Sequence, residues 1–323
     1  MTKPLLRVAD LAVSFASPEG PIRAVDGVDF ELQPGETLAL VGESGSGKST
    51  LARAVIGLTA TSRGSIELEG EQVVGADRAK LRELRRKMQL VFQDPYESLN
   101  PRMTIGRTIA EPLLYQANSN AAQRAGEVER LLARVGLDPG FAARYPHEFS
   151  GGQRQRISLA RALAMRPRLL LCDEVTSALD VSVQAQILEL LRTLQRELGL
   201  AYLFITHDLG VVRSIAQRVA VMYLGKLVEL RTTESFFEQP RHPYSQALLG
   251  SVPRLRRAGD AASSGLTGEI PSAARPPSGC RFHTRCPKVF DRCPREEPGL
   301  YPIPNGVSRC FLDENEAGGE INV

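Results

Sequence analysis

The sequence predicts an α/β fold with a mostly parallel β-sheet, and two observations lead to it. Short apolar runs of strand length recur along the chain, at 38–41, 169–172 and 202–205. Longer segments of helical periodicity lie between them, and 183–198 is the strongest because its aliphatic residues recur every three or four positions. Strands that alternate with amphipathic helices pair in parallel, since each helix returns the chain to the same end of the sheet.

The expected elements occupy most of the first 250 residues. The run at 38–41 ends in a Gly/Ser-rich loop, and a helix is expected after it at 49–58. The segment from about residue 94 to residue 166 is mostly helical by period and is expected to form a helical subdomain. The other expected elements are strand and turn at 64–74, a helix at 79–87, strands at 88–92 and 219–223, and a helix at 152–165 that Pro167 ends.

Composition and charge are those of an ordinary globular chain. The 323 residues carry a formal net charge of +3, with 42% hydrophobic and 24% charged residues. So small a net charge gives no reason to expect nucleic acid as a partner. No apolar run approaches the ~20 residues of a membrane-spanning helix, and no apolar stretch of signal-peptide length follows the N-terminus. The chain is therefore expected to be cytoplasmic, with any membrane spans supplied by other subunits.

The Gly-rich loop that follows the first apolar run fits the pattern G-x-x-x-x-G-K-[ST] in full. Its glycines let backbone N–H groups approach phosphate oxygens, and the helix N-terminus adds the positive end of its dipole. Lys48 is predicted to bridge the β- and γ-phosphates of ATP, and Ser49 to hold Mg²⁺. The residues predicted to bind nucleotide here are Gly42, Ser44, Gly45, Ser46, Gly47, Lys48, Ser49 and Thr50. The alternative is a Gly-rich turn without a ligand.

Two adjacent carboxylates follow the apolar run at 169–172. Asp173 is placed to orient Mg²⁺ or its waters, and Glu174 to act as the base or water-orienting group for attack on the γ-phosphate. Two carboxylates at the end of a strand are costly without a cation, and Mg²⁺ supplies one. The alternative for Asp173 is a helix cap, but no helix is expected to begin there.

A second cluster of small residues opens the expected helix at 152–165. The segment 149–155, Phe-Ser-Gly-Gly-Gln-Arg-Gln, resembles the signature motif of ABC ATPases. A helix N-terminus of this composition can offer a Ser hydroxyl and backbone N–H groups to an anion. The resemblance implies that the cradle serves the nucleotide bound by a second, head-to-tail subunit. Its residues are Ser150, Gly151, Gly152 and Gln153.

Four more positions match this family in order, and the resemblance extends over about residues 5 to 250. It implies that Gln93 senses Mg²⁺ and the attacking water, and that His207 contacts the γ-phosphate. It also places Asp180 in the loop that crosses the dimer interface. Phe15 matches the aromatic residue that stacks on adenine, with a plain core position as the alternative for its ring.

One position departs from the family pattern. Val175 stands where these ATPases usually have proline, which would make the turn after the catalytic carboxylate rigid. Valine is expected to leave the chemistry intact and to loosen the turn.

Three stretches resemble the ATPase subunits of oligopeptide and dipeptide importers, at 92–104, 147–150 and 241–244. The resemblance implies an ATP- and Mg²⁺-dependent subunit at the cytoplasmic face of the membrane. Its expected partners are two permease subunits, a second ABC ATPase subunit (a paralogue or another copy) and an extracytoplasmic substrate-binding protein. Nickel and glutathione stay open as alternative cargoes. An exporter subunit, or a soluble ABC ATPase acting on DNA or ribosomes, is the alternative class.

The composition changes after about residue 253, so an ABC ATPase domain is expected at 1–250 and a C-terminal extension at 251–323. Four cysteines gather at 280–310 with the spacing C-x₅-C-x₆-C-x₁₆-C, wider than the pairs of most zinc sites. Four thiolates can hold Zn²⁺ or a [4Fe–4S] cluster, and the wide spacing favours the cluster. Similar cysteines in this extension of peptide-importer ATPases support a bound metal. The alternative is reduced thiols or a disulfide pair. The four residues are Cys280, Cys286, Cys293 and Cys310.

Overall fold

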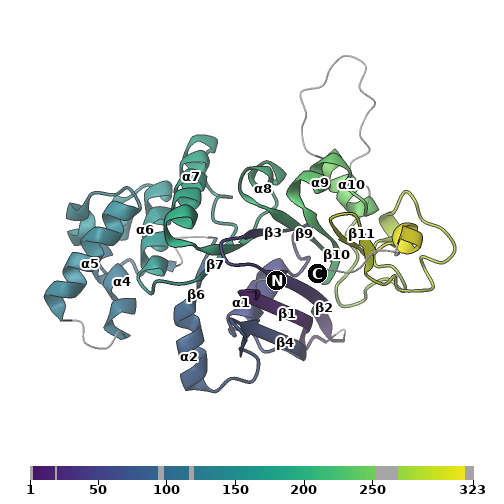
Figure 1. Cartoon of the computed structure of the whole chain (residues 1–323), viewed down its shortest axis with the longest axis horizontal. Helices are drawn as coiled ribbons and strands as arrows, with labels where there is room; N and C mark the ends of the chain where they lie inside the picture. The colour runs from purple at the N-terminus through teal and green to yellow at the C-terminus, as the bar shows by residue number, and fades with distance from the viewer. Residues whose placement is uncertain (1–2, 19, 94–97, 116–119, 252–267, 317–323) are drawn as a thin grey trace, which may run out of the picture. The chain divides into compact units, whose positions relative to one another are not determined.

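The computed structural model describes residues 3–18, 20–93, 98–115, 120–251 and 268–316 (Figure 1). Residues 94–97 of the stretch at 92–104 and residues 252–267 of the extension lie outside them. The chain divides into two compact units, one of Met1–Gln33, Thr37–Gly75 and Ile205–Val323 and the other of Pro34–Glu36 and Ala76–Phe204. In the described part of the chain, no helix combines the length and the apolar character needed to cross a bilayer.

A four-stranded antiparallel sheet in the first unit has the order β2-β1-β4-β5. Leu6 of β1 pairs with Leu32 of β2 on one side and Leu68 of β4 on the other, and all three side chains are fully buried. The periodicity does not predict β1 and β2, because the pairing shifts register between Val8 and Leu11 and the alternation breaks there. The four strands are β1 (Leu6–Phe15), β2 (Ile22–Leu32), β4 (Arg63–Leu68) and β5 (Glu71–Gln72).

A second set of strands in the first unit follows the order β11-β12-β10-β9-β3. β3 (Thr37–Val41) pairs in parallel with β9 (Arg218–Tyr223), as the α/β prediction requires. β10 (Lys226–Thr232) then turns back antiparallel to β9. From the C-terminal extension, β12 (Gly306–Ser308) pairs with β10 and β11 (Tyr301–Ile303) with β12. The extension therefore continues the sheet that contains β3.

Aromatic rings pack the last helix of the first unit and the extension against β9. The ring of Tyr223 at the end of β9 lies 4.7 Å from that of Tyr244 and 5.2 Å from that of Phe282, centroid to centroid. All three side chains are buried. Such pairs stabilise beyond the area that they bury. The helices of this unit are α1 (Lys48–Val55), α8 (Leu209–Ile215), α9 (Thr233–Glu238), α10 (Pro243–Gly250) and the 3-10 helices His283–Arg285 and Phe311–Glu316.

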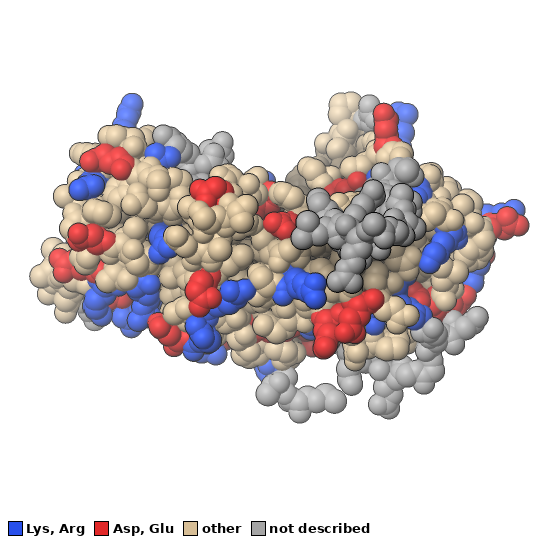
Figure 2. Space-filling view, turned by 90° about the horizontal axis from the view of Figure 1, so that it is seen from above, with Lys and Arg blue, Asp and Glu red and all other residues tan. Residues whose placement is uncertain are grey.

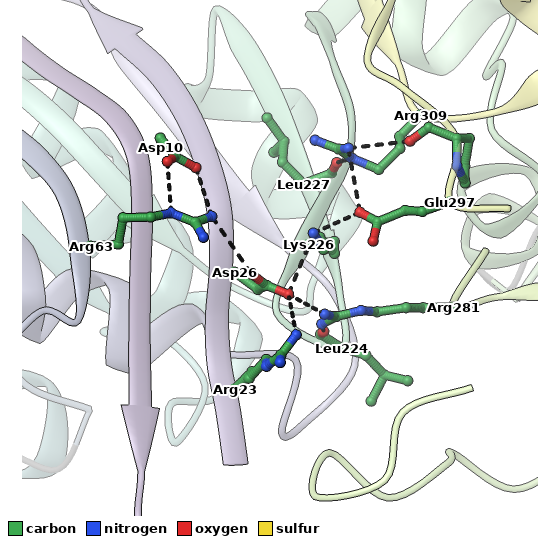
Figure 3. Close-up of polar contacts among 11 residues, drawn as sticks. Asp10, Arg23, Asp26, Arg63, Leu224, Lys226, Leu227, Arg281, Glu297 and Arg309 are labelled. Carbon is green, nitrogen blue, oxygen red and sulfur yellow. Dashed lines mark hydrogen bonds and ion pairs between the residues drawn. The ribbon is translucent and has the colours of Figure 1, made fainter. Parts of the chain in front are cut away.

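A network of ion pairs around the largely buried Asp26 also connects the extension to the rest of the first unit (Figure 3). Asp26 of β2 contacts Arg281 of the extension, and the Nζ atom of Lys226 lies 3.4 Å from Asp26 and 2.6 Å from Glu297. Burial by itself would raise the pKa of Asp26, but Lys226 and Arg281 lower it below its ordinary value. Arg309 donates to the carbonyl oxygen of Leu227 at 3.0 Å. The network therefore connects β2, β10 and the extension through ion pairs and a hydrogen bond.

The second unit contains three strands in the order β8-β7-β6. β6 (Met88–Val91) and β7 (Leu169–Asp173) are parallel, with Met88 opposite Leu169. β8 (Ala201–Ile205) is buried throughout, and its last residue belongs to the first unit. These strands lie within a residue or two of the predicted runs, because continuous apolar segments of this length belong to sheets covered on both faces.

Helices make up most of the rest of the second unit. Between residues 98 and 166 the described positions contain helices and turns and no strand, as the helical period predicts. Helix α5 begins with a reciprocal capping box between Asn120 and Gln123, and α7 ends at Gly199 with φ 65°. The helices are α2 (Arg78–Lys87), α4 (Ile105–Ala110), α5 (Ala121–Arg134), α6 (Gly151–Leu163) and α7 (Val181–Leu198), with 3-10 turns at Pro112–Tyr115, Pro139–Ala143 and Pro146–Glu148.

Figure 2 shows the charged side chains on one face of the molecule. Lys and Arg side chains lie interspersed with Asp and Glu on that face. This mixture agrees with the nearly equal totals of 40 basic and 37 acidic residues in the chain.

Candidate nucleotide site and catalytic carboxylates

The Gly-rich loop between β3 and α1 requires glycine at two positions, because a Cβ atom there would collide with neighbouring backbone. Gly42 has φ 152°, and a Cβ atom there would lie 2.2 Å from the carbonyl oxygen of Met222. Gly47 has φ 105°, and its Cβ would lie 2.0 Å from the carbonyl oxygen of Ala24. No side chain fits at either distance, so the loop passes directly over the backbones of β2 and β9.

The N-terminus of α1 has no side-chain cap. Its N-cap is Gly47, which has no side chain to occupy the first N–H groups of the helix. Lys48 is 6% exposed, and its ammonium donates to the carbonyl oxygens of Gly42 at 2.8 Å and Glu43 at 2.9 Å. It therefore lies inside the curve of the loop, among acceptors that phosphate oxygens can replace. Ser44 and Gly45 at the tip are exposed, and Ser49 and Thr50 lie half-buried in the first turn.

The two predicted carboxylates lie at the end of β7 in the second unit. Asp173 is its last residue and is 6% exposed. Glu174 has a positive φ of 49°, which costs a non-glycine residue about 1 kcal/mol or more. Gln93 donates from Nε2 to Oε2 of Glu174 at 3.1 Å. The structure thus brings together two of the three residues predicted to be catalytic, although they are far apart in sequence.

Two neighbours of these carboxylates are buried. Burial raises the pKa of Cys172 to about 12, with Asp173 adding to the shift, so this thiol stays protonated at neutral pH. Val175, which stands in place of the usual proline, is 2% exposed, so its side chain packs into the core after the strained residue Glu174.

The signature-like segment forms the N-terminus of α6 with a reciprocal capping box. The hydroxyl of Ser150 accepts from the backbone N–H of Gln153 at 3.4 Å, and the side-chain oxygen of Gln153 accepts from the N–H of Ser150 at 3.0 Å. The hydrogen of the Ser150 hydroxyl is still available as a donor. Gly151 is exposed, and a Cβ there would meet only the side chain of Leu179 at 3.6 Å. A Cβ on Gly152 would lie 2.3 Å from Val183, so this second glycine is needed for packing.

Three more predicted residues have defined places. Asp180 is the N-cap of α7 and accepts from the N–H of Val183 at 2.9 Å, so it has a local structural role. Hydrogen bonds from Ser182 and Val183 lower its pKa. Phe15 at the end of β1 is 43% exposed, which rules out a plain core position for its ring. His207 follows β8 and is exposed.

The predicted nucleotide residues divide between the two units. The Gly-rich loop, Phe15 and His207 belong to the first unit, whereas Gln93, Asp173, Glu174, Asp180 and the segment 150–153 belong to the second. The proposed Mg²⁺ ligands divide in the same way, with Ser49 in the first unit and Gln93 and Asp173 in the second.

Sequence reasoning missed the residues that surround Glu43 in the loop. Tyr244 and Arg285 both contact it, across separations of 201 and 242 residues. The stretch at 241–244 carries a family resemblance but no assigned role, and nothing local marks Arg285 as a partner of the loop. No sequence pattern signals a contact at this separation.

The four clustered cysteines lie around one cavity in the first unit. Cys280, Cys286, Cys293 and Cys310 all line it, together with aromatic rings that include that of Phe282. All four are free cysteines, so the disulfide alternative is wrong for these residues. Burial raises the pKa of Cys280 to about 11 and that of Cys310 to about 12. Within the described ranges, however, no three His, Cys, Asp or Glu side chains converge closely enough to hold a single metal ion.

A strand followed by a loop that fits the phosphate-binding pattern, with its lysine, and a pair of carboxylates at the end of another strand are features of nucleotide-binding ATPases. Comparison with known families agrees. The family described as ABC transporter matches residues 25–177, and the one described as the oligopeptide/dipeptide transporter C-terminal region matches residues 228–293.

Known proteins resemble the chain over most of its length. The oligopeptide transport ATP-binding protein AppF of Bacillus subtilis is 52% identical over 282 residues, which cover 86% of each chain. The oligopeptide transport ATP-binding protein OppF of Salmonella typhimurium is 49% identical over 92% of this chain and 93% of its own. The chain therefore belongs to the family of ABC transporter ATP-binding subunits, in the branch that carries the oligopeptide/dipeptide transporter C-terminal region.

A solved structure extends the likeness to the fold. The dimeric ATP-binding cassette MJ0796, in a post-hydrolysis state with ADP and phosphate, has a TM-score of 0.65 and 29% identity to this chain. The match covers 98% of that cassette but 71% of this chain, so part of this chain has no counterpart there. The family and this likeness together show that the chain is an ATPase whose hydrolysis of ATP is coupled to transport.

Proposed function

We propose that this chain binds and hydrolyses ATP to power the import of dipeptides and oligopeptides through a membrane transporter. The observation that carries the proposal is the match of residues 228–293 to the oligopeptide/dipeptide transporter C-terminal region, supported by relatives named for oligopeptide transport. Two permease subunits, a second ATPase subunit and an extracytoplasmic binding protein would complete the transporter. The chain would then lie at the cytoplasmic face of the membrane.

The chemistry assigned to the loop is phosphate binding. Lys48 would exchange the carbonyl oxygens of Gly42 and Glu43 for the β- and γ-phosphate oxygens of ATP. Backbone N–H groups at the start of α1, where no side chain caps the helix, would donate to the same phosphates. Ser49 in the first turn would hold Mg²⁺, and the exposed ring of Phe15 offers a face on which adenine can stack.

Hydrolysis requires a water aligned with the γ-phosphate and a group to take its proton. Glu174 is proposed as that base, with Gln93 orienting its carboxylate through the 3.1 Å hydrogen bond. Asp173 would hold Mg²⁺ or its waters, and His207 would contact the γ-phosphate. The strained backbone of Glu174 supports a functional role, because strain of this kind persists at sites where geometry matters more than stability.

The capped N-terminus of α6 is proposed to complete the site of a second, head-to-tail ATPase subunit. The Ser150 hydroxyl and the backbone N–H groups of Gly151 and Gly152 would donate to the γ-phosphate held by that subunit. Gly151 is exposed, so a phosphate can approach its backbone closely. Asp180, besides capping α7, would lie near the same interface.

The substrate class is tested by transport in the assembled system. We expect ATP-driven uptake of labelled dipeptides or oligopeptides when the subunit is combined with its permease and binding protein. Uptake of nickel or glutathione without peptide uptake would contradict the peptide assignment. ATP-dependent binding to DNA or ribosomes without membrane association would contradict the transporter role as a whole.

We further propose that the four cysteines of the extension hold a [4Fe–4S] cluster with a structural role. One observation supports the fit: all four thiols line one cavity. The wide spacing of the four cysteines in the sequence favours a cluster over zinc. The raised pKa values of Cys280 and Cys310 mean that their thiols stay protonated until a metal binds, so loading would release protons.

A further inference from the structure

Glu43, the second residue of the phosphate loop, is held from outside the loop by the C-terminal part of the chain. Arg285 of the extension donates from Nη1 to Oε2 of Glu43 at 2.7 Å and from Nη2 to Oε1 at 3.0 Å. The backbone N–H of Glu43 donates to the hydroxyl of Tyr244 in α10 at 2.8 Å. Both the side chain and the backbone of this loop residue are therefore fixed by residues that follow it by more than 200 positions.

These contacts are largely shielded from solvent, unlike most ion pairs on protein surfaces. The side chain of Arg285 is 4% exposed and that of Glu43 is 21% exposed. Arg285 also donates to the hydroxyl of Tyr223 at 3.4 Å, and Tyr223 and Tyr244 are themselves packed ring to ring. A forked pair between a guanidinium and a carboxylate has fixed geometry and keeps its strength when water is excluded. We call these four residues, Glu43, Tyr223, Tyr244 and Arg285, the Glu43 cluster.

The Glu43 cluster acts on Lys48 directly. The carbonyl oxygen of Glu43 accepts from the ammonium of Lys48 at 2.9 Å, and it also accepts from the N–H of Ser46 at 3.2 Å. Tyr244 holds the peptide group between Gly42 and Glu43, and the carbonyl oxygen of that group, on Gly42, also accepts from Lys48, at 2.8 Å. The Glu43 cluster therefore restrains the carbonyl groups that hold the ammonium of Lys48. A loop ordered before binding loses less conformational entropy when the nucleotide arrives.

The Glu43 cluster also decides the charge beside the phosphates. A carboxylate in the loop repels a triphosphate, and the repulsion is strong where water is excluded. The guanidinium of Arg285 neutralises that carboxylate through both of its oxygen atoms. Without Arg285, Glu43 would stand uncompensated within the loop that must accept several negative charges.

We propose that Arg285 is a positioning residue for the ATPase reaction, which makes the C-terminal extension a working part of the nucleotide site. It neutralises Glu43 and, together with Tyr244, holds the loop in its phosphate-binding form. The inference rests on the proposed assignment of residues 42–49 to the phosphates of ATP. Neither the site prediction nor the family resemblance assigns a role to Arg285.

The test is equilibrium ATP binding and the KM for ATP hydrolysis with the full-length chain. We expect Arg285→Ala to weaken ATP binding and to raise KM about tenfold, with kcat at saturating ATP changed about twofold or less. Arg285→Lys keeps the positive charge but cannot make the forked hydrogen bonds, so its loss of ATP affinity should be smaller than that of Arg285→Ala. The double variant Glu43→Gln with Arg285→Ala removes the repelling charge and should recover most of the lost affinity.

Arg241→Ala is the matched control. Arg241 also forms a largely buried ion pair with the extension, at 2.9 Å to Asp313, which lies outside the Glu43 cluster. Its removal should leave ATP affinity within about twofold of the wild type while loosening the extension to a similar degree. An equal loss of affinity in Arg241→Ala and Arg285→Ala would reduce Arg285 to a general structural role and overturn the proposal.

Two further outcomes separate this inference from the site assignment. If Lys48→Ala abolishes ATP binding while Arg285→Ala leaves it unchanged, the loop assignment stands and the role of Arg285 is refuted. If Lys48→Ala binds ATP normally, the loop assignment itself fails. A double variant as weak as Arg285→Ala alone would also overturn the proposal, because charge compensation predicts recovery.

Discussion

Gln93 and Glu174 are joined by a hydrogen bond of 3.1 Å across 81 residues of sequence, from the end of β6 to the end of β7. The pairing of β6 with β7 is parallel, so both strands end at the same edge of the sheet. The amide of Gln93 therefore orients the carboxylate that is proposed to activate water. Glu174 is the residue of the pair with the strained backbone, and Gln93 restricts its side chain as well.

Replacing Glu174 by Gln tests the catalytic assignment. We expect ATP to bind normally but to be hydrolysed about a hundredfold more slowly or worse, because an amide cannot accept the proton of the attacking water. The substitution keeps the shape and an oxygen that can still accept from Gln93, so folding should not change. Steady-state ATPase rates and nucleotide affinity measure the two effects. Glu189→Gln on the exposed face of α7 is the control, and normal turnover in Glu174→Gln would refute the assignment.

Substituting Gly151 by Asp tests the contribution of the signature-like segment to a second subunit. The site is exposed and a Cβ there meets only Leu179 at 3.6 Å, so the variant should fold and bind ATP as an isolated subunit. We expect its ATPase rate in the assembled transporter to fall about a hundredfold or more, because the new charge faces the phosphate of the partner.

Two glycine-to-alanine variants separate this effect from packing. Gly151→Ala should fold normally and lose less activity than Gly151→Asp, whereas Gly152→Ala should lower stability because its Cβ would lie 2.3 Å from Val183. Full hydrolysis by monomers of Gly151→Asp would contradict the shared-site proposal.

The cysteine cluster predicts a coloured protein when it is purified without oxygen. We expect visible absorbance from sulfur-to-iron charge transfer and about four iron atoms per chain. Cys293→Ser should lose the absorbance and unfold at lower temperature, whereas Cys172→Ser, outside the cavity, should keep the absorbance. A colourless protein with stoichiometric zinc would refute the iron–sulfur cluster and indicate a zinc site. A protein without any metal would refute the metal site as a whole.

The ion-pair network around Asp26 predicts a pH-dependent contribution to stability (Figure 3). Lys226 and Arg281 lower the pKa of Asp26 below the ordinary value of 3.8 against the opposing effect of burial. The contribution of Asp26 to the free energy of unfolding is therefore fully present when the pH is above its ordinary pKa. It is lost as the pH falls through the lower pKa of the folded state. Asp26→Asn should lower the free energy of unfolding on the order of 2 kcal/mol at pH 7, with a difference that shrinks below about pH 4.

Glu189→Gln is the control for this effect. Glu189 also pairs with an arginine, Arg192, at 3.2 Å, but their side chains are 61% and 37% exposed. Exposed pairs contribute about 1 kcal/mol or less. Denaturant unfolding at several pH values measures both variants, and a loss in Asp26→Asn that grows as the pH falls would contradict the network's role.

The residues proposed to bind phosphate and the strand-end carboxylates can be predicted from the sequence because each group lies in contiguous residues. Gly42, Gly47 and Lys48 are read from one short run, and the structure adds the backbone distances that make the two glycines necessary. The apolar runs of β3, β7 and β8 are equally local, since strands covered on both faces must be apolar throughout.

Other features depend on how distant segments meet. In β1 and β2 the alternation of apolar and polar residues is broken by register shifts. β12 pairs with β10 because the fold places Ser308 opposite Glu229. Arg285 reaches Glu43 across 242 residues, and no periodicity or motif encodes a contact between segments so far apart. Local residue types determine which groups of the loop can bind phosphate. The tertiary structure determines that Arg285 neutralises the charge of Glu43, because a buried ion pair forms only where the fold brings both partners together.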